Sequence, residues 1–379
     1  MALKRSTVCV HGVDAAFDNT GAISVPIFQS ATFEHPGAGK STGFDYARSK
    51  NPNQLALEQI MAKLEGASEA VAMSTGMSAI HVFVSLFKPG DHLITSEDLY
   101  GVTRRIFFEI CPKYNIEFTA VDTADLDAVK AAVRPNTKGI FIETPTNPTM
   151  RVTDISAVAA IAKSIGALTA VDNTFLSPYY QNPIELGADI VIHSGTKYLA
   201  GHNDSMSGVF ITNDKDIADK ARWYAKTYGV TITAFEAWLS VRGLKTLALR
   251  MDRCSQSALE IAQFLKTLPN VTEVYYPGLP EHPAYELSKR QARGFGGMVA
   301  FKCKDGAVAK KALESVQIWT YAESLGGVES LITCPIYITH LDIPVEEREK
   351  RGISDNFLRL SVGIEDAEDL KADLAQALA

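Results

Sequence analysis

The chain has 379 residues, more than one hydrophobic core usually serves, so we expect two domains. Hydrophobic residues make up 46% and charged residues 21% of the sequence, which is typical of a soluble globular protein and not of a disordered chain. The net charge of −7 argues against nucleic acid or an anionic membrane surface as the main partner.

The N-terminal segment, residues 1 to about 50, has no strong hydrophobic period and is rich in Gly, Ser, Thr and Pro. We therefore expect an extended arm with little core of its own. No long apolar run follows Lys4 and Arg5, so we expect no signal peptide, and no stretch approaches the roughly 20 apolar residues of a membrane span. The cysteines are odd in number and scattered, which favours reduced thiols in a cytoplasmic protein.

Between about residues 55 and 212, short apolar runs alternate with amphipathic segments of helical length. The runs are Ala70–Met73, His92–Thr95, Phe118–Val121, Gly139–Ile142, Leu168–Val171, Ile190–Ile192 and Gly208–Ile211. Several of these runs are apolar without alternating polar residues, as expected for strands that are buried on both faces. This alternation predicts a mostly parallel sheet covered by helices, an α/β fold.

The rest of the chain is different in pattern. Residues from about 213 to 265 are typical of long helices, and a smaller α+β unit follows, with a strand at Met298–Phe301 and a final helix near Ala367–Leu378. We therefore predict an N-terminal arm at 1–50, a large α/β domain at 51–250 and a C-terminal α+β domain at 251–379.

Polar residues follow the predicted strands, where open α/β sheets bind their ligands. Gly76 and Met77 lie in a run of small residues that opens a helix, which can bind an anion or can simply be a capped helix start. Tyr100 follows the next strand and is either a ring facing this edge or a surface tyrosine. Asn147 lies between two prolines in a stiffened loop, where ordinary turn chemistry is the alternative.

Asp172 and Lys197 follow two further strands. Asp172 can be an N-cap or a ligand, and a lone lysine in a loop of small residues is more often a solvated charge than a nucleophile. His193, His202 and Asp204 match no zinc pattern, so we expect no metal. The glycines before Lys197 do not have the spacing of a P-loop either.

Taken together, these residues describe one kind of site. Lys197 can form a Schiff base with an aldehyde, and Asp172 can pair with a protonated pyridine nitrogen. The helix start at Gly76, with the hydroxyls of Ser194 and Thr196, can hold a phosphate. With an aromatic ring to stack on the cofactor ring, this set meets the needs of pyridoxal 5′-phosphate (PLP).

Nearly the whole chain resembles the Cys/Met-metabolism family of PLP-dependent enzymes, the group of cystathionine γ-synthases, cystathionine β- and γ-lyases and methionine γ-lyases. The segments that carry the resemblance are Tyr46–Pro52, Ser74–Ile80, Glu143–Pro148, Val171–Phe175, Leu186–Asp189, Ser194–Tyr198, Gly201-His202, Ala322–Gly327 and Arg359–Gly363. The resemblance implies a fold-type I, aspartate-aminotransferase-like architecture with a seven-stranded sheet.

The resemblance also implies roles for individual residues. Lys197 would be the Schiff-base lysine and proton shuttle, Asp172 the partner of the pyridine nitrogen, and Tyr100 the stacking ring. The residues expected to hold the cofactor within one subunit are Gly76, Met77, Thr174, Ser194 and Thr196. The residues expected to bind the substrate are Arg359, Asn147, Ser324, Glu323 and Arg105, with the Arg359 guanidinium gripping the α-carboxylate.

The same resemblance implies that Tyr46 and Arg48 reach the phosphate from a neighbouring subunit, in a homodimer that pairs into a homotetramer. Three positions depart from the usual family pattern. Asn53 stands where threonine is usual, Val102 where glycine is usual and Asn203 where serine is usual. Val102 flanks the stacking tyrosine and is expected to influence substrate access.

The choice of reaction is harder, because β-elimination, γ-elimination and γ-replacement use the same groups. Glu323 favours a cystathionine-using member, and Val102 argues against a methionine γ-lyase, which usually has cysteine there. The stretch Thr339–Pro344 resembles bacterial β-lyases, whereas Tyr276–Pro280 resembles γ-lyases. We therefore predict a cystathionine lyase, β or γ, that acts on a small amino acid, with γ-synthase or methionine γ-lyase as the alternative.

The sequence argues against two other classes of protein. A dinucleotide-dependent oxidoreductase needs a Gly-x-Gly-x-x-Gly after a strand, and the fragment Gly294-x-Gly296-Gly297 opens no convincing helix. A purely structural protein would leave the polar residues at the strand ends without a reason.

Overall fold

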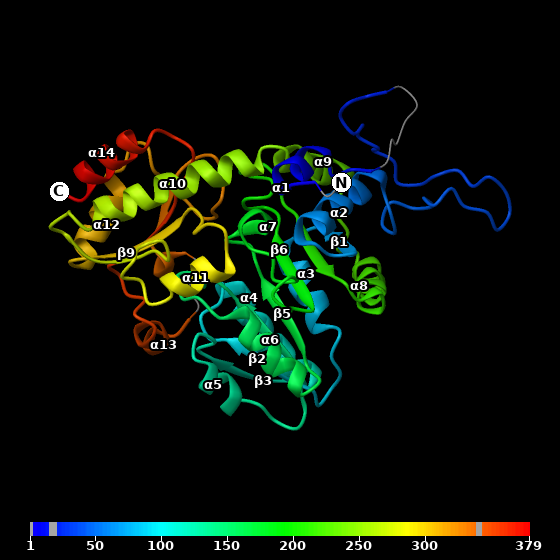
Figure 1. Ribbon diagram of the computed structural model, residues 1–379, viewed down its shortest axis with the longest axis horizontal. Helices are drawn as coiled ribbons and strands as arrows, with labels where there is room; N and C mark the ends of the chain where they lie inside the picture. The colour runs from blue at the N-terminus through cyan, green and yellow to red at the C-terminus, as the bar shows by residue number, and fades with distance from the viewer. Residues whose placement is uncertain (1–2, 15–20, 339–342) are drawn as a thin grey trace.

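The computed structural model describes residues 3–14, 21–338 and 343–379. Within these residues the strands form two separate sheets, one of seven strands and one of five (Figure 1). None of the described helices is both long and apolar enough to cross a membrane. The polypeptide between the sheets is mainly helical, as expected.

The seven-stranded sheet has the order β1-β7-β6-β5-β4-β2-β3. Its strands are β1 (Glu69–Met73), β2 (His92–Ser96), β3 (Glu117–Val121), β4 (Thr137–Glu143), β5 (Leu168–Asp172), β6 (Ile190–Ser194) and β7 (Gly208–Thr212). Strands β2 to β6 pair in parallel, and β7 is antiparallel to both of its neighbours. Each of the seven apolar runs in the sequence forms one of these strands, so the prediction of a mostly parallel seven-stranded sheet is confirmed.

Both faces of this sheet are covered, which explains why most residues of its central strands are apolar. On β1, Ala70 and Ala72 pack into a cluster with residues of helix α2, whereas Val71 and Met73 pack into another cluster with residues of α3 and α8. The helices of this part of the chain are α2 (Pro52–Glu65), α3 (Gly76–Val84), α4 (Gly101–Arg105), α5 (Leu126–Ala131), α6 (Ile155–Ser164), α7 (Ser177–Tyr180), α8 (Lys215–Tyr228) and α9 (Ala234–Leu244), with a π-turn at Ile106–Ile110 and a 3-10 turn at Cys111–Tyr114.

The five-stranded sheet has the order β10-β11-β12-β9-β8 and is antiparallel except for the β10–β11 pair. Its strands are β8 (Val271–Tyr275), β9 (Met298–Cys303), β10 (Thr320–Tyr321), β11 (Leu331–Thr333) and β12 (Phe357–Ser361). The helices around it are α11 (Tyr285–Gln291), α12 (Gly306–Ser315), α13 (Val345–Lys350) and α14 (Ala367–Ala377), with a 3-10 turn at Pro335–Tyr337. The expected smaller α+β unit is therefore present.

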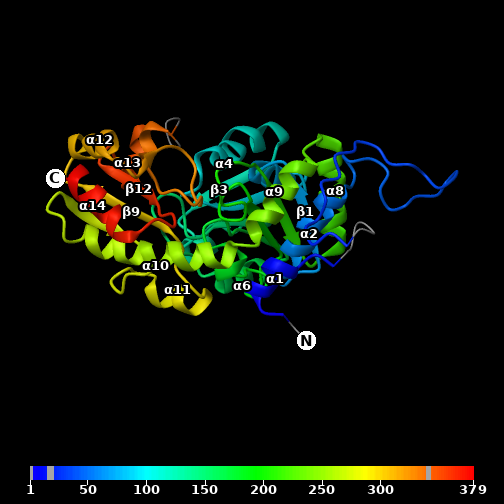
Figure 2. The ribbon, with the colours of Figure 1, turned by 90° about the horizontal axis from the view of Figure 1, so that it is seen from above.

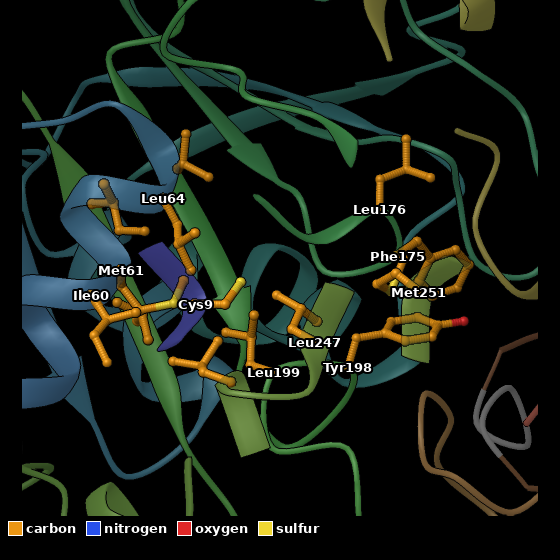
Figure 3. Close-up of a cluster of buried hydrophobic side chains, with 14 of the residues drawn as sticks. Cys9, Ile60, Met61, Leu64, Phe175, Leu176, Tyr198, Leu199, Leu247 and Met251 are labelled. Carbon is orange, nitrogen blue, oxygen red and sulfur yellow. The ribbon is translucent and has the colours of Figure 1, made fainter. Parts of the chain in front are cut away.

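The N-terminal arm contains one element that the sequence did not predict. Residues Arg5–His11 form the short helix α1, and its Cys9 is fully buried in the same hydrophobic cluster as Met61 and Leu247 (Figure 3). The expectation of an arm with little core was therefore wrong for α1. Seven residues give too few turns for a helical hydrophobic period to stand out. Beyond α1, residues 21–50 extend away from the body of the protein (Figure 1).

Helix α10 (Leu247–Leu265) connects the two sheets. It runs along the molecule from the neighbourhood of α9 to that of α14 (Figures 1 and 2). Its first residues pack in the cluster of the large sheet and its later residues in the cluster of the small sheet. The predicted domain limits stay predictions, and the limit at residue 250 falls inside this helix.

Candidate active site

A cavity of about 230 Å³ lies beyond the carboxyl ends of the central strands, between the two sheets. Its lining residues come from helices α3 and α4, from strands β4, β5, β6 and β12, and from the loops between these elements: Thr75, Gly76, Met77, Ile80, Tyr100, Thr103, Glu143, Pro145, Asn147, Asp172, Thr174, Phe175, Ser194, Thr196, Lys197, Met206, Glu323, Ser324, Leu325 and Arg359. Most of the residues that the sequence singled out therefore face one space. Two larger depressions, of about 910 and 620 Å³, lie elsewhere and contain none of them.

Lys197 lies in the turn that follows β6, and its Nζ donates a hydrogen bond to Ser324 Oγ at 2.7 Å. Burial lowers the pKa of the Lys197 amine from 10.5 to about 8; the nearby Arg359 charge also lowers it, and Glu323 acts in the opposite direction. A larger share of neutral amine is available at neutral pH than for a solvated lysine. Neutral amine is the form that attacks an aldehyde, so this environment suits a Schiff-base lysine.

Asp172 ends β5, and its carboxylate is held by Thr174. The Thr174 backbone N–H donates to Asp172 Oδ1 at 3.0 Å and the Thr174 hydroxyl donates to the same oxygen at 2.6 Å. Burial raises the pKa of the Asp172 carboxyl, whereas the two Thr174 hydrogen bonds and the His193 charge lower it. Asp172 is thus a partly buried acid whose ionised form would be stabilised further by a cation in the cavity.

The N-terminus of α3 meets the loop after β6 at very close range. Thr75 caps the helix by accepting a hydrogen bond from Ser78 N at 3.1 Å, so the capped-start interpretation is correct. A Cβ at position 76 would lie 2.8 Å from Ser194 Cβ, so only glycine permits this approach. The helix start and the hydroxyls of Ser194 and Thr196 therefore line the same end of the cavity, and an anion can bind there as well.

Glu143, at the end of β4, joins two of the predicted site residues. Its Oε2 accepts a hydrogen bond from Tyr100 N at 3.1 Å and its Oε1 accepts one from Asn147 N at 3.0 Å. Burial raises the pKa of the Glu143 carboxyl well above its usual range, and the nearby Asp172 and Asp98 carboxyls raise it further. In the sequence, Glu143 stands out only as the first residue of the segment Glu143–Pro148, and no pattern there indicates its role.

Arg359, on β12 of the small sheet, reaches the cavity and is 2% exposed. Its Nη1 donates to Asn147 Oδ1 at 2.8 Å and its Nη2 to the Ser324 carbonyl at 2.8 Å. Its Nε is buried and has no hydrogen-bond partner among the described residues. Burial lowers the pKa of the Arg359 guanidinium to about 10, so it remains a cation that can bind a carboxylate.

Glu323 and Arg105 lie at the rim of the site. Glu323 is an exposed residue that still lines the cavity. Arg105, at the end of α4, is exposed and does not line the cavity. Burial raises the pKa of the Tyr100 hydroxyl, Glu323 raises it further, and Arg359 and Arg105 lower it, so both rim charges lie within electrostatic range of Tyr100.

Tyr46 and Arg48 lie outside the lining of this cavity. Tyr46 is 46% exposed. Arg48 Nη1 donates to the Lys226 carbonyl at 3.2 Å, and the guanidinium lies 5.4 Å from the centre of the Tyr46 ring. The structure of one chain does not bring these two residues to its own site, and their role across a subunit interface stays a prediction.

His193 has a structural partner in the core. Its Nε2 lies 2.6 Å from Glu65 Oε1, and both side chains are almost completely buried. Asn173 Nδ2 donates to the same Glu65 oxygen at 3.0 Å. His202 instead contacts the Ala200 carbonyl through Nδ1 at 2.7 Å. The described residues contain no group of His, Cys, Asp and Glu side chains that could hold a metal ion.

The departures from the family pattern lie in different environments. Asn53 is fully buried, accepts a hydrogen bond from Phe28 N at 2.8 Å and donates one to the Pro26 carbonyl at 2.7 Å, so it holds the arm against α2. Asn203 Nδ2 donates to Glu329 Oε2 at 2.7 Å. Val102 is not among the lining residues of the cavity. Of the stretch Thr339–Pro344, residues 339–342 lie outside the described residues.

The cavity fits PLP on three structural observations. The close approach at Gly76 and Ser194 leaves helix N–H groups and hydroxyls at one end, where a phosphate would bind. Asp172 is a partly buried carboxylate that a protonated ring nitrogen would pair with. Lys197 carries an amine of lowered pKa in the same cavity.

Other lining residues were given no role from the sequence, namely Thr75, Ile80, Thr103, Glu143, Pro145, Phe175, Met206 and Leu325. All of these except Thr103 and Met206 belong to segments that carried the resemblance, so their sequence position was a signal. Thr103, on α4, follows Tyr100, which was singled out. Met206 comes from a loop without a motif, and only the fold brings it to the site.

Comparison with known proteins gives three kinds of match. A family model described as "Cys/Met metabolism PLP-dependent enzyme" matches residues 6–379. A cystathionine gamma-lyase of Bacillus subtilis (strain 168) is 46% identical over 376 residues, 99% of each chain. A cystathionine beta-lyase of Lactococcus lactis subsp. cremoris (strain MG1363) is 47% identical over 372 residues, 98% of each chain.

A solved structure has a very similar fold. The cystathionine gamma synthase of Xanthomonas oryzae pv. oryzae, in complex with aminoacrylate and cysteine, superposes with a TM-score of 0.97 at 40% identity, covering 100% of this chain and 98% of that one.

Proposed function

Because this chain belongs to the Cys/Met-metabolism family of PLP-dependent enzymes, we propose that it is a carbon–sulfur lyase that cleaves L-cystathionine by β- or γ-elimination. The predicted family, enzyme class and PLP cofactor are confirmed by the match over residues 6–379. The roles of the individual site residues and the physiological substrate are part of the proposal.

One observation carries the proposal. Lys197, in the turn after β6 of the large sheet, and Arg359, on β12 of the small sheet, both reach Ser324: Lys197 Nζ donates to its hydroxyl and Arg359 Nη2 to its carbonyl. A base and a carboxylate-binding guanidinium therefore lie on either side of one residue. This spacing suits an α-amino acid, whose carboxylate and Cα proton are separated by one carbon atom.

The residues act by binding and by moving protons. When bound, PLP supplies an electron sink for negative charge that develops at the substrate Cα. Arg359 binds the α-carboxylate, with Asn147 fixing the guanidinium through Nη1. Lys197, as a neutral amine, accepts the Cα proton and can return it to the leaving sulfur. Asp172 binds the ring nitrogen and keeps it protonated.

Glu143 contributes by holding two of these groups in place. It accepts hydrogen bonds from the backbone N–H groups of Tyr100 and Asn147, so the stacking ring and the partner of Arg359 are fixed to one carboxyl. Because Glu143 is the last residue of β4 in the central sheet, these hydrogen bonds fix the backbone of Tyr100 and Asn147 to the sheet.

Product analysis tests the proposal. Purified enzyme with PLP is incubated with L-cystathionine, and the products are separated. β-Elimination yields homocysteine, pyruvate and ammonia, whereas γ-elimination yields cysteine, 2-oxobutyrate and ammonia. If neither set forms, but cystathionine appears from cysteine and an O-acyl-homoserine, the enzyme is a γ-synthase; one of the structural relatives is named as such.

The proposal includes the assembly and location of the enzyme. We propose a homodimer, paired into a homotetramer, in which Tyr46 and Arg48 complete the phosphate site of the neighbouring subunit; their exposed position on the arm supports this. A cytoplasmic location is supported by the five free and buried cysteines.

Complementation tests the shared site. Arg48→Ala and Lys197→Ala variants are each expected to be inactive, and mixing them under conditions of proven subunit exchange should restore one intact site in each hybrid dimer. A mixture that exchanges subunits but recovers no activity would show that each site is built from one chain.

A further inference from the structure

A buried guanidinium, that of Arg250, binds backbone carbonyls of the turn that contains Lys197. Arg250, in the first turn of α10, is 5% exposed. Its Nη1 donates to the Tyr198 carbonyl at 2.6 Å, and its Nη2 donates to the Leu199 carbonyl at 3.3 Å and to the Gly243 carbonyl at 2.8 Å. These acceptors are neutral, so carbonyl dipoles stabilise the buried charge.

The carbonyls that Arg250 binds are those that the turn itself leaves free. Residues 195–200 form hydrogen-bonded turns, in which Ala200 N donates to the Gly195 carbonyl and Gly201 N to the Lys197 carbonyl. At Gly201 the chain leaves the turn with φ +71°, so the next carbonyls, of Tyr198 and Leu199, receive no donor from a continuing helix.

Packing around this contact is tight. A Cβ at position 201 would lie 2.0 Å from Arg250 Nη1, so the guanidinium fills the space that glycine leaves. Side chains on both sides of Arg250 in α10, Leu247 and Met251, belong to the same buried cluster as Tyr198 and Leu199 (Figure 3). The turn therefore has little freedom to move relative to α10.

The same helix also reaches the small sheet. Three residues further on, Arg253 Nη2 donates to the Glu365 carbonyl at 3.0 Å. The Glu365 carboxylate accepts hydrogen bonds from the backbone N–H of Ser330 at 2.6 Å and from its hydroxyl at 2.8 Å. Successive turns of α10 thus bind the Lys197 turn and the segment that follows β12, the strand of Arg359.

We propose that Arg250 is a positioning residue that sets the location of Lys197 relative to Arg359. Arg250 touches neither substrate nor cofactor; it fixes the backbone from which the reactive amine extends. The inference rests on the proposed role of Lys197. Lysine cannot replace arginine here, because a single ammonium cannot reach three carbonyls in the directions that a planar guanidinium serves.

The test compares Arg250→Lys with Arg242→Lys, an exposed arginine on the neighbouring helix α9. For the PLP-loaded Arg250→Lys enzyme we expect an unchanged far-UV circular dichroism spectrum, a weakened visible circular dichroism band of the bound cofactor and a turnover of L-cystathionine lowered by about 100-fold, the size of effect that a 1 Å displacement causes. Arg242→Lys should match the parent enzyme in all three. A lower thermal midpoint with unchanged visible signal and turnover would overturn the proposal.

A second variant decides the question if Arg250→Lys does not fold. Thr246→Val removes the hydroxyl that accepts from Arg250 Nε at 3.1 Å and leaves the side-chain shape unchanged. We expect the same two changes, smaller in size, and an unaltered signal and turnover would again overturn the proposal. Failure of the proposed function is recognised separately, because the parent enzyme would then form neither set of elimination products from L-cystathionine. Near-parental turnover by Lys197→Ala would instead reject the proposed role of Lys197.

Discussion

The two sides of the cavity are built from different parts of the chain. On the side where we propose that the cofactor binds, the cofactor side, Asp172 is held by Thr174, two residues away. On the side where we propose that the substrate binds, the substrate side, Arg359 is held by Asn147, 212 residues away, and by Ser324, 35 residues away. The cofactor side therefore depends on one sheet, whereas the substrate side depends on how two sheets are joined.

The two sides should therefore respond differently to a shift of the small sheet relative to the large sheet. Contacts between residues close in sequence form again whenever the strand and its loop form, so the cofactor side should survive small shifts of the small sheet. Contacts across 212 residues are lost when the sheets move apart. We expect variants at the sheet junction to lose substrate affinity while they keep PLP.

The largest effect is expected at Lys197. In Lys197→Ala the visible absorption band of the lysine-linked cofactor should disappear, and turnover should fall by at least about 10⁴-fold, because the proton acceptor and covalent anchor are both lost. PLP should still bind through its phosphate, as equilibrium dialysis can measure. Lys215→Ala, an exposed lysine on α8, is the control and should behave as the parent enzyme. Near-parental turnover by Lys197→Ala would show that the reactive lysine lies elsewhere.

A smaller loss is expected on the substrate side. Arg359→Lys keeps the charge but cannot bind Asn147, Ser324 and a carboxylate together. We expect a loss of about 3 kcal/mol in transition-state binding, or roughly 100-fold in kcat/KM, as for other truncated buried charge pairs. Steady-state kinetics measure kcat/KM, and titration with PLP measures the affinity for the cofactor. Arg290→Lys on α11 is the exposed control. Loss of PLP in parallel with substrate would break the division between the two sides.

Glu323 lies on the substrate side but at the exposed rim of the cavity, so a smaller effect is expected there. Its carboxylate is suited to bind the distal ammonium of cystathionine through a charge-assisted hydrogen bond of about 1.5 kcal/mol, worth roughly tenfold. Glu323→Ala should lower kcat/KM on cystathionine by about tenfold and on methionine by less. Glu323→Gln, which keeps the shape, should lose most of the same preference. Equal losses on both substrates would mean that Glu323 shapes the site without recognising the distal group.

The smallest expected effect is a shift in pH dependence. Because burial lowers the pKa of Lys197 to about 8, the amine is protonated and unreactive below that pH and neutral above it. The rate at which cofactor-free enzyme forms the visible band with PLP should therefore rise with pH, with a midpoint near 8. Arg359→Leu should raise this midpoint, since the Arg359 charge also lowers the pKa.

Two observations would contradict this explanation. A midpoint near the value of a solvated lysine, about 10.5, would show that Lys197 is not desolvated. A midpoint that also governs the binding of 4′-deoxypyridoxine 5′-phosphate, which has no aldehyde, would belong to another group.

The sequence alone determined the parts of this protein whose physical cause is local. Short, mainly apolar runs identified all seven strands of the large sheet, because strands that are buried on both faces contain few polar residues. The residues Asp172, Ser194 and Lys197 could be identified because parallel strands bring the residues that follow them to one edge.

Tertiary structure decided what depends on distant residues. Glu143 joins Tyr100 to Asn147, Glu65 pairs with His193 across 128 residues, and Arg250 lies 52 residues from the carbonyl it binds most closely. No local pattern marks such partners, because a buried polar group is satisfied by whichever donor or acceptor the packed fold brings to it. The location of Lys197 relative to Arg359 was fixed in the same way, by the junction of two sheets.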